Sequence, residues 1–193
     1  MRAVILNGGS SKRFGEDKSE YLIGTKPMIE HVYEKLSRVF TQIVLVGKPY
    51  KGLQYLKDRY SAGPLGGVLT AIEIFEDDLF VVGCDMPFIL PDVVESMIDL
   101  FKVEKTDAVV PKLSDGIHPL HAIYSRTIRE NLVKSMVCAD SSFRAAFDHS
   151  KVLYVTEDFF REIPNWEWSF VNINTKSDLK FLEVAGCSYK LTR

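Results

Sequence analysis

The first half of the chain alternates short apolar runs with segments of helical period. Residues 3–6, 42–47 and 79–83 contain the apolar runs, and each has the length of a strand. A continuous apolar run is typical of a strand that is covered on both faces, as in a parallel sheet. The pattern therefore predicts three buried strands.

Apolar positions spaced three to four residues apart follow each predicted strand, which is the spacing of one helix face. They are Met28, Val32, Leu36 and Val39, then Val68, Leu69, Ile72 and Phe75, then Val93, Val94, Met97, Ile98 and Phe101. Pro27 suits the first turn of the first helix, and a glycine-rich turn, Gly63–Gly67, precedes the second. Three consecutive strand-then-helix units predict an α/β fold with three layers, Rossmann-like, with a mostly parallel sheet and right-handed crossovers.

The second half of the chain is less regular. Its pattern predicts strands at Asp107–Pro111, Leu120–Tyr124 and Val152–Thr156, and helices at Thr127–Val133 and Ser141–Phe147. It does not determine the direction of these strands. Near the end, Thr175 and Asp178 have the spacing of a helix capping box. Because no repeat or linker interrupts the chain, we expect residues 1–193 to form a single domain.

Composition narrows the class of protein. Apolar residues make up 46% of the chain and charged residues 26%, and the net charge of -2 gives no broad attraction for nucleic acid or an anionic membrane. The apolar run at residues 3–6 is too short for a signal peptide, and no later run approaches a membrane span, so we expect a cytoplasmic protein. Cys84, Cys138 and Cys187 lie far apart, which favours reduced, buried thiols over disulfides or a zinc site.

A loop after the first predicted strand has the composition of a phosphate site. Ligands of open α/β sheets bind beyond the carboxyl ends of the strands. Residues 7–18 combine glycines, serines and three cations, of which Arg13 and Lys18 are placed to neutralise a triphosphate. The loop lacks both the dinucleotide fingerprint and the Walker A pattern. A solvated loop without function is the alternative interpretation.

Asp85 directly follows the strand predicted at 79–83, in the segment Cys84–Pro87. Magnesium prefers hard oxygen ligands and commonly binds one or two carboxylates plus substrate phosphates, so Asp85 is the predicted Mg²⁺ ligand. The alternative is an aspartate that only caps the turn before Pro87. Asn172 and Asn174 alternate on an extended segment and point the same way. They either bind a ligand together or satisfy backbone groups at a strand end.

The chain resembles one known family along nearly its whole length. Residues 6–15, Asp17–Lys18, Lys26–Pro27 and Ile29–Val32 look like the signature of the MobA family, the molybdenum cofactor guanylyltransferases. Further along, Gly63–Gly67 resembles the family's Gly-Pro-Leu-x-Gly turn, Cys84–Pro87 its Cys-Asp-x-Pro metal motif, His118–Pro119 its His-Pro pair and Val171–Thr175 its Val-Asn-x-Asn-Thr segment. The chain departs from the family pattern at Asn7, Phe14, Glu20–Tyr21 and in the short stretch between Asp58 and Gly63.

The resemblance implies a nucleotidyltransferase fold whose N-terminal part binds the nucleotide and whose C-terminal part binds the acceptor. The implied nucleotide site consists of Leu6, Asn7, Gly8, Gly9, Ser10, Lys18, Asp58, Gly66 and Asp85. The implied acceptor site consists of His118, Asn172 and Asn174, and the implied catalytic groups are Arg13, Lys18 and Asp85, with Mg²⁺ on Asp85.

The implied reaction transfers GMP from GTP to Mo-molybdopterin, forming molybdopterin guanine dinucleotide and pyrophosphate. A phosphate nucleophile is already ionised, so the reaction requires no general base. The implied partners are GTP, Mo-molybdopterin and, transiently, other proteins of cofactor biosynthesis. The residues leave open a related nucleotidyltransferase that uses CTP or another nucleoside triphosphate with a different phosphorylated acceptor. A nucleotide-binding module without catalysis is a second alternative, because a fold alone never implies function.

Overall fold

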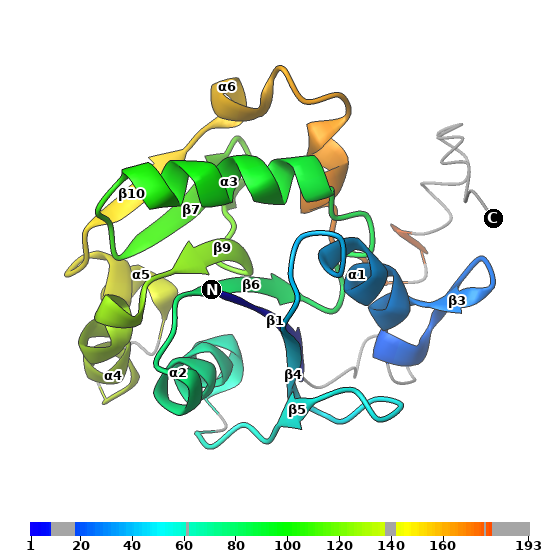
Figure 1. Cartoon of the computed structure of the whole chain (residues 1–193), viewed down its shortest axis with the longest axis horizontal. Helices are drawn as coiled ribbons and strands as arrows, with labels where there is room; N and C mark the ends of the chain where they lie inside the picture. The colour runs from blue at the N-terminus through cyan, green and yellow to red at the C-terminus, as the bar shows by residue number, and fades with distance from the viewer. Residues whose placement is uncertain (9–17, 61, 138–141, 176, 179–193) are drawn as a thin grey trace.

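One large mixed sheet organises the molecule (Figure 1). The computed structural model describes residues 1–8, 18–60, 62–137, 142–175 and 177–178. In this part of the chain the strand order is β10-β7-β9-β6-β1-β4-β5, with β8 paired to β7. The strands are β1 (Arg2–Asn7), β4 (Ile43–Gly47), β5 (Tyr55–Leu56), β6 (Leu79–Gly83), β7 (Ala108–Leu113), β8 (Gly116–Ile117), β9 (His121–Tyr124) and β10 (Val152–Val155). A separate hairpin joins β2 (Leu22–Ile23) to β3 (Lys26–Pro27).

The parallel half of the sheet contains the three strands predicted in the first half of the chain. β1 lies between β4 and β6 and runs parallel to both, with Ala3 opposite Ile43 and Phe80. β9 is antiparallel to β6 and β7, whereas β10 is parallel to β7. The mostly parallel sheet is therefore confirmed, and the structure supplies the strand directions that the pattern left open.

Helices cover both faces of the sheet, which confirms the three-layer prediction. They are α1 (Met28–Leu36), α2 (Gly63–Phe75), α3 (Pro91–Val103), α4 (Arg129–Val137), α5 (Phe143–Phe147) and α6 (Glu157–Phe160), with 3₁₀ turns η1 (Lys18–Glu20), η2 (Arg126–Ile128) and η3 (Trp166–Phe170). In Figure 1, α3 lies above the sheet and α2 and α4 lie below it. Apolar residues of α1, α3 and η3 pack on one face, and those of α2, α4 and α5 pack on the other.

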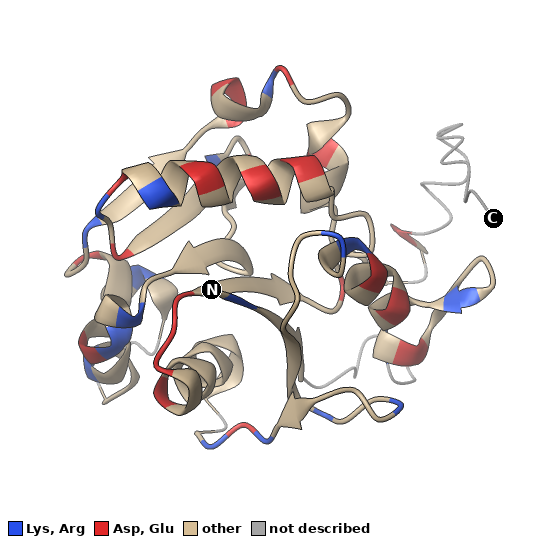
Figure 2. Ribbon diagram, viewed as in Figure 1, with Lys and Arg blue, Asp and Glu red and all other residues tan. Residues whose placement is uncertain are grey.

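Helix α2 is the most buried helix near the predicted site. Figure 2 shows it almost without charge, since Glu73 is its one charged residue. The glycine-rich segment predicted to be a turn before this helix is instead its first turns: α2 begins at Gly63, with Pro64 at a position where proline costs no hydrogen bond. Gly67 lets the helix approach β1, because an added Cβ would come within 2.9 Å of Leu6 Cδ2.

Two smaller boundaries also differ from the prediction. Pro27 lies in β3, one residue before α1, and its φ of -57° already suits the helix that follows. α1 ends at Leu36, and the backbone bends through a turn at Ser37 to Val39. The apolar spacing extended past the helix because Val39 packs on the same core from that turn. Helix period alone does not locate a helix end.

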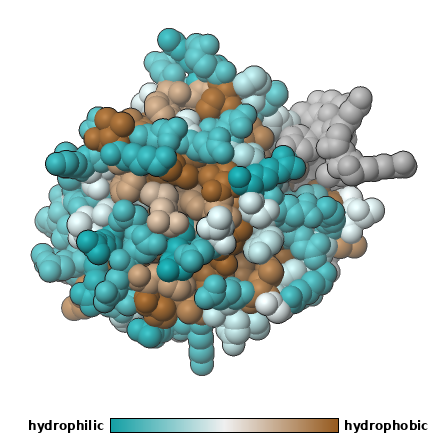
Figure 3. Space-filling model, in the orientation of Figure 1, coloured by the Kyte–Doolittle hydropathy of each residue, from teal (hydrophilic) through white to brown (hydrophobic). Residues whose placement is uncertain are grey.

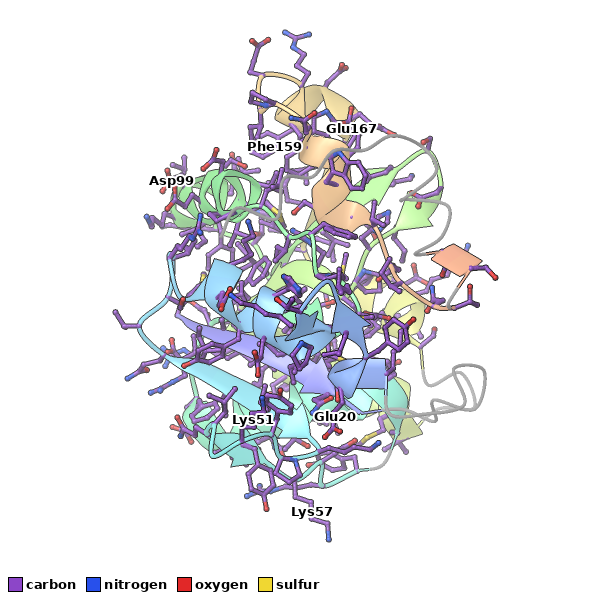
Figure 4. The ribbon with its side chains drawn as sticks, turned by 90° about the vertical axis from the view of Figure 1, so that its right-hand side faces the viewer. Glu20, Lys51, Lys57, Asp99, Phe159 and Glu167 are labelled. Carbon is purple, nitrogen blue, oxygen red and sulfur yellow. The ribbon has the colours of Figure 1, made fainter. Side chains whose placement is uncertain are left out.

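The surface mixes polar and apolar groups. Figure 3 shows apolar patches between hydrophilic ones on the face that Figure 1 presents. Figure 4 gives the side view, with Glu20, Lys51 and Lys57 in its lower part and Asp99, Phe159 and Glu167 in its upper part. The β4–β5 region and the α3–α6–η3 region therefore lie on opposite sides of the molecule. No helix among the described residues is long and apolar enough to cross a membrane.

A candidate active-site cleft at the carboxyl ends of the strands

A cleft of about 450 Å³ opens where β1, β4 and β6 end. Residues 6–8, 46–48 and 83–85 line it, each segment lying at the carboxyl end of one of these parallel strands. The first turns of α2 form a further wall through Gly63, Pro64 and Gly67. Ligands of open α/β sheets bind at such an edge, so this cleft is the candidate site.

Lys18 connects three segments that are distant in the sequence. Its Nζ donates to Asp85 Oδ2 at 2.8 Å and to Asn174 Oδ1 at 2.9 Å. The Lys18 and Asp85 side chains are 17% and 22% exposed, so the ion pair lies partly screened from water within the cleft. The last residue of the predicted phosphate loop thus bonds both the predicted metal ligand and the predicted acceptor segment. Gly9, Ser10 and Arg13 lie outside the described residues.

The Asp85 carboxylate has its place because position 83 lacks a side chain. A Cβ added at Gly83 would overlap Asp85 Oδ1. The Met86 N–H donates to the Gly83 carbonyl in the tight turn that follows β6, and the Asp85 carbonyl accepts from the Ile173 N–H at 2.9 Å. Backbone bonds therefore fix Asp85 on one side, while Lys18 holds its carboxylate on the other.

Asn7 fastens the end of β1 to the end of β4. The residue is 3% exposed, and its Nδ2 donates to the Lys48 carbonyl at 3.0 Å. Its carbonyl accepts from the Lys48 N–H at 2.7 Å. Gly47 permits this approach, since its φ of +117° is rare for other residues and an added Cβ would lie 2.5 Å from the Asn7 carbonyl oxygen. Asn7 and Gly47 thus shape this wall together.

Asp58 also lines the cleft, and it is held by local bonds. Its Oδ1 accepts from the Tyr60 N–H at 2.9 Å and from the Thr70 hydroxyl of α2 at 3.3 Å. Gly66, predicted to contact the nucleotide, packs behind this loop, because an added Cβ would meet Tyr60 Cβ at 3.1 Å and Asp58 Oδ1 at 3.4 Å. The neighbouring Gly63 and Gly67 line the cleft instead.

A polar network fastens the Asp58 loop to the helices below the sheet. The Tyr60 hydroxyl donates to Glu73 Oε2 at 2.5 Å, and Arg129 Nη2 donates to Glu73 Oε1 at 2.7 Å. The hydrogen bond from Tyr60 lowers the pKa of Glu73, burial opposes the shift, and Arg129 adds to the lowering. The same bond is the main cause that raises the pKa of Tyr60. Glu73 therefore stays ionised as the acceptor of this network.

The acceptor segment alternates as predicted. Ile173 is fully buried, whereas Asn172 and Asn174 are exposed on either side of it. The predicted capping box is formed: Asp178 Oδ2 accepts from the Thr175 N–H at 2.8 Å, and the Asp178 N–H reaches the Thr175 hydroxyl at 3.3 Å. Asp178 Oδ2 also accepts from the Asn174 N–H at 2.7 Å, which fixes the residue that bonds Lys18.

Three of the four histidines, His31, His118 and His121, have structural environments outside the cleft lining. His118, predicted to contact the acceptor, bonds Asp115 Oδ1 through Nε2 at 2.8 Å and packs edge-on against Phe170. His121 is fully buried, and burial first and the nearby His118 second lower its pKa to about 3. His31 bonds the Ile23 carbonyl. Among the described residues these histidines thus bond to carboxylate or carbonyl oxygens or lie against aromatic rings.

Several cleft residues were not predicted from the sequence. Gly47, Lys48, Ser19 and Leu120 line the cavity beside the predicted groups. Gly47 ends β4 and Lys48 directly follows it, so the rule that singled out the residues after the first and third strands also applied here. Ser19 and Leu120 carry no such signal, because their position depends on tertiary folding of η1 and of the segment before β9.

The donor set of the cleft suits a magnesium ion held partly by substrate. Asp85 offers hard carboxylate oxygen, and a cation, the Lys18 ammonium, already lies 2.8 Å from Oδ2. In the described part of the chain no three His, Cys, Asp or Glu residues gather as a metal cage. A carboxylate completed by substrate phosphates is the mode that Mg²⁺ commonly adopts.

Known proteins resemble this chain in sequence and in structure. The family model of the MobA-like NTP transferase domain matches residues 3–158. A probable molybdenum cofactor guanylyltransferase of Pyrococcus furiosus is 35% identical, over 93% of this chain and 95% of its own length. One of Thermococcus sibiricus is 36% identical, over 96% of this chain and 98% of its own length. The structure of molybdopterin-guanine dinucleotide biosynthesis protein A of Archaeoglobus fulgidus superposes with a TM-score of 0.85 at 27% identity, over 97% of this chain and 99% of its own.

Proposed function

The chain belongs to the MobA-like NTP transferase family, and on this premise we propose that it transfers GMP from GTP to Mo-molybdopterin. The products are molybdopterin guanine dinucleotide and pyrophosphate. One observation carries the proposal: Lys18 Nζ, which lines the cleft, bonds both Asp85 Oδ2 and Asn174 Oδ1, so groups suited to the triphosphate, the metal and the acceptor lie close together. We further propose that residues 1–193 act as one domain, with the nucleotide bound by its N-terminal part and the acceptor by its C-terminal part.

The proposed reaction is a direct in-line displacement. A terminal phosphate oxygen of the acceptor forms a bond to the α-phosphorus of GTP, the bond from that phosphorus to the bridging oxygen breaks, and pyrophosphate leaves. This chain's residues contribute positioning and charge stabilisation rather than a covalent intermediate. Lys18 neutralises phosphate charge, and Leu6, Asn7 and Gly8, which line the cleft, contact the nucleotide. Gly9, Ser10 and Arg13 extend this proposed phosphate site.

We propose Asp85 as the residue that holds Mg²⁺. When bound, the ion would neutralise charge on the phosphates. Asp85 fits because its carboxylate faces the cleft and is already held by a cation. Lys18 bonds both Asp85 and Asn174, so Asn174 would remain its partner if the Asp85 carboxylate held the ion.

The wall at Asp58 is the proposed site of the base. A carboxylate accepts hydrogen bonds and donates none, so it favours a base edge that carries N–H groups. Guanine presents its N1–H and its exocyclic amino group side by side, and a site that bonds such groups rejects a base that lacks them. Gly66 supports this wall from behind, since it packs against Asp58. The acceptor is assigned to Asn172 and Asn174, with His118 as a more remote contact.

The test is a reaction of purified protein with GTP, Mg²⁺ and Mo-molybdopterin. We expect pyrophosphate and a dinucleotide product that carries guanine, in equal amounts. CTP, ATP and UTP in place of GTP are the matched comparisons, and omission of Mg²⁺ tests the metal. Product with CTP in preference to GTP, or pyrophosphate release without the acceptor, contradicts the proposed reaction. Turnover undiminished by chelation contradicts the proposed magnesium requirement.

A further inference from the structure

A fully buried hydroxyl lies in the middle of α2. Thr70 is 0% exposed and is surrounded in the helix by Leu69, Ala71 and Ile72, which belong to the apolar core below the sheet. Burying a hydroxyl in such a core costs free energy unless it is hydrogen-bonded. A valine would fill the same space without that cost, so the bonds of this hydroxyl explain its presence.

The Thr70 hydroxyl makes two hydrogen bonds to the segment that forms the proposed base wall of the cleft, the segment around Asp58. Oγ1 accepts from the Arg59 N–H at 3.1 Å and donates to Asp58 Oδ1 at 3.3 Å. The Tyr60 N–H donates to the same carboxylate oxygen at 2.9 Å. Two donors from different directions therefore converge on Oδ1 and restrict rotation of the carboxylate, which lines the cleft.

Tyr60 anchors the loop that carries Asp58 to α2 through a different bond. Its hydroxyl bonds Glu73 Oε2, one turn along α2, without touching the Asp58 carboxylate. Thr70 thus links the helix to the carboxylate, whereas the Tyr60 hydroxyl links the helix to the loop. The two roles are separable by substitution, because the Tyr60 N–H is unaffected by loss of its hydroxyl.

We propose that Thr70 is a positioning residue for base selection: its hydroxyl orients the Asp58 carboxylate toward the N–H groups of guanine. The inference rests on the proposed function, because it takes the Asp58 wall as the base site. Inosine triphosphate is the sharpest probe, since hypoxanthine keeps the N1–H of guanine and lacks the exocyclic amino group. A well-oriented carboxylate distinguishes the two nucleotides, and a poorly oriented one does not.

The experiment measures binding of Mg-GTP and Mg-ITP by calorimetry to the full chain. The wild type should bind GTP at least about tenfold more tightly than ITP, and Thr70→Val should lower this ratio about tenfold. Thr70→Ser keeps the hydroxyl and should keep the ratio. Tyr60→Phe is the matched control, which should weaken the loop's anchorage and leave the ratio unchanged. In an Asp58→Ala background, Thr70→Val should have no further effect on the ratio.

An unchanged ratio in folded Thr70→Val overturns the inference, and so does an equal loss of the ratio in Tyr60→Phe. If Thr70→Val does not fold, loss of the ratio in Thr70→Ala supports the inference and retention overturns it. A wild type that binds ITP as tightly as GTP also overturns it. Product formation from GTP and Mo-molybdopterin is measured separately. A wild type that selects GTP through Thr70 but makes no dinucleotide contradicts the proposed function alone.

Discussion

The two aspartates of the cleft are held by different kinds of structure. Asp85 bonds Lys18, 67 residues away, and its carbonyl accepts from Ile173 in a still more distant segment. Asp58 bonds the backbone of Tyr60 two residues away and Thr70 twelve residues away. The proposed metal end of the cleft, at Asp85, is therefore assembled from segments distant in the sequence, whereas its proposed base end, at Asp58, is a local unit of one loop and one helix. We expect the first to govern turnover and the second to govern nucleotide selection.

Removal of the Asp85 carboxylate should have the largest effect on activity. Asp85→Ala should lower turnover at least about 1,000-fold, because the proposed metal ligand is lost. The fold should persist, since Lys18 keeps its bond to Asn174. Pyrophosphate release at saturating GTP and circular dichroism measure the two effects.

Two other aspartates give the controls for Asp85→Ala. Asp58→Ala should retain more turnover at saturating GTP and lose mainly affinity. Asp99→Ala, on the exposed face of α3 and paired only with Lys102 in the described contacts, should leave both unchanged. A folded Asp85→Ala variant with most of its activity would show that the metal end does not carry the chemistry.

Gly83→Ala tests the metal end without removing any functional group. The new Cβ would overlap Asp85 Oδ1, so the carboxylate must move. A displacement of about 1 Å in a catalytic group costs on the order of 100-fold, and we expect that loss in turnover at saturating GTP. Steady-state kinetics of the folded variant measure it, and thermal unfolding shows that the fold remains.

Gly66→Ala is the matched change at the base end. Its Cβ would lie 3.4 Å from Asp58 Oδ1 and 3.1 Å from Tyr60 Cβ, so the loop needs to shift only by tenths of an ångström. The added helix propensity offsets part of the strain. We expect less than about a tenfold change, in KM for GTP rather than in kcat. Equal losses of turnover in Gly83→Ala and Gly66→Ala would contradict the proposed difference between the Asp85 and Asp58 ends of the cleft.

Lys18→Met separates the two roles of the ammonium group. Binding of Mg-GTP should weaken about tenfold or more, because a charge-assisted bond to phosphate is lost. Binding of Mn²⁺ alone should strengthen severalfold, since Lys18 no longer competes for Asp85 Oδ2. Calorimetry with each ligand gives both affinities. Unchanged GTP affinity contradicts the phosphate role, and weaker Mn²⁺ binding contradicts the competition.

The sequence predicted the parallel half of the fold well. The apolar runs at 79–83 and 3–6 became β6 and β1 with little change of boundary, because a strand buried on both faces leaves a continuous apolar pattern. The directions of β9 and β10 were not predictable, since side-chain period is the same in parallel and antiparallel strands. The helix start at Gly63 was missed because glycine and proline ordinarily indicate a turn.

The site residues likewise fall into two groups: those that the sequence identified and those that it missed. Asp85 and Lys18 were identifiable because each follows or precedes a recognisable element and matches a known motif. Thr70 was not, because one threonine within an apolar helix has no pattern of its own, and its importance depends on Asp58 lying within hydrogen-bond distance after folding. Lys48 was missed although it directly follows β4, since no motif drew attention to that strand end.

The smallest expected effect concerns the pH dependence of the base end. Hydrogen bonding from Tyr60, opposed by burial and aided by Arg129, lowers the pKa of Glu73 below its ordinary value of 4.5. Because the folded pKa is depressed, the stability that Glu73 contributes is fully present above pH 4.5 and is lost as the pH falls through the folded pKa.

Glu73→Gln should therefore lower the free energy of unfolding by about 1 kcal/mol at pH 7 and by less at pH 3. Urea unfolding at both pH values measures the difference, and Glu34→Gln, whose exposed carboxylate pairs with Lys26, is the control with little effect at either pH. A Glu73→Gln deficit that is as large at pH 3 as at pH 7 would mean that the side chain stabilises the base end by packing rather than as an ionised acceptor.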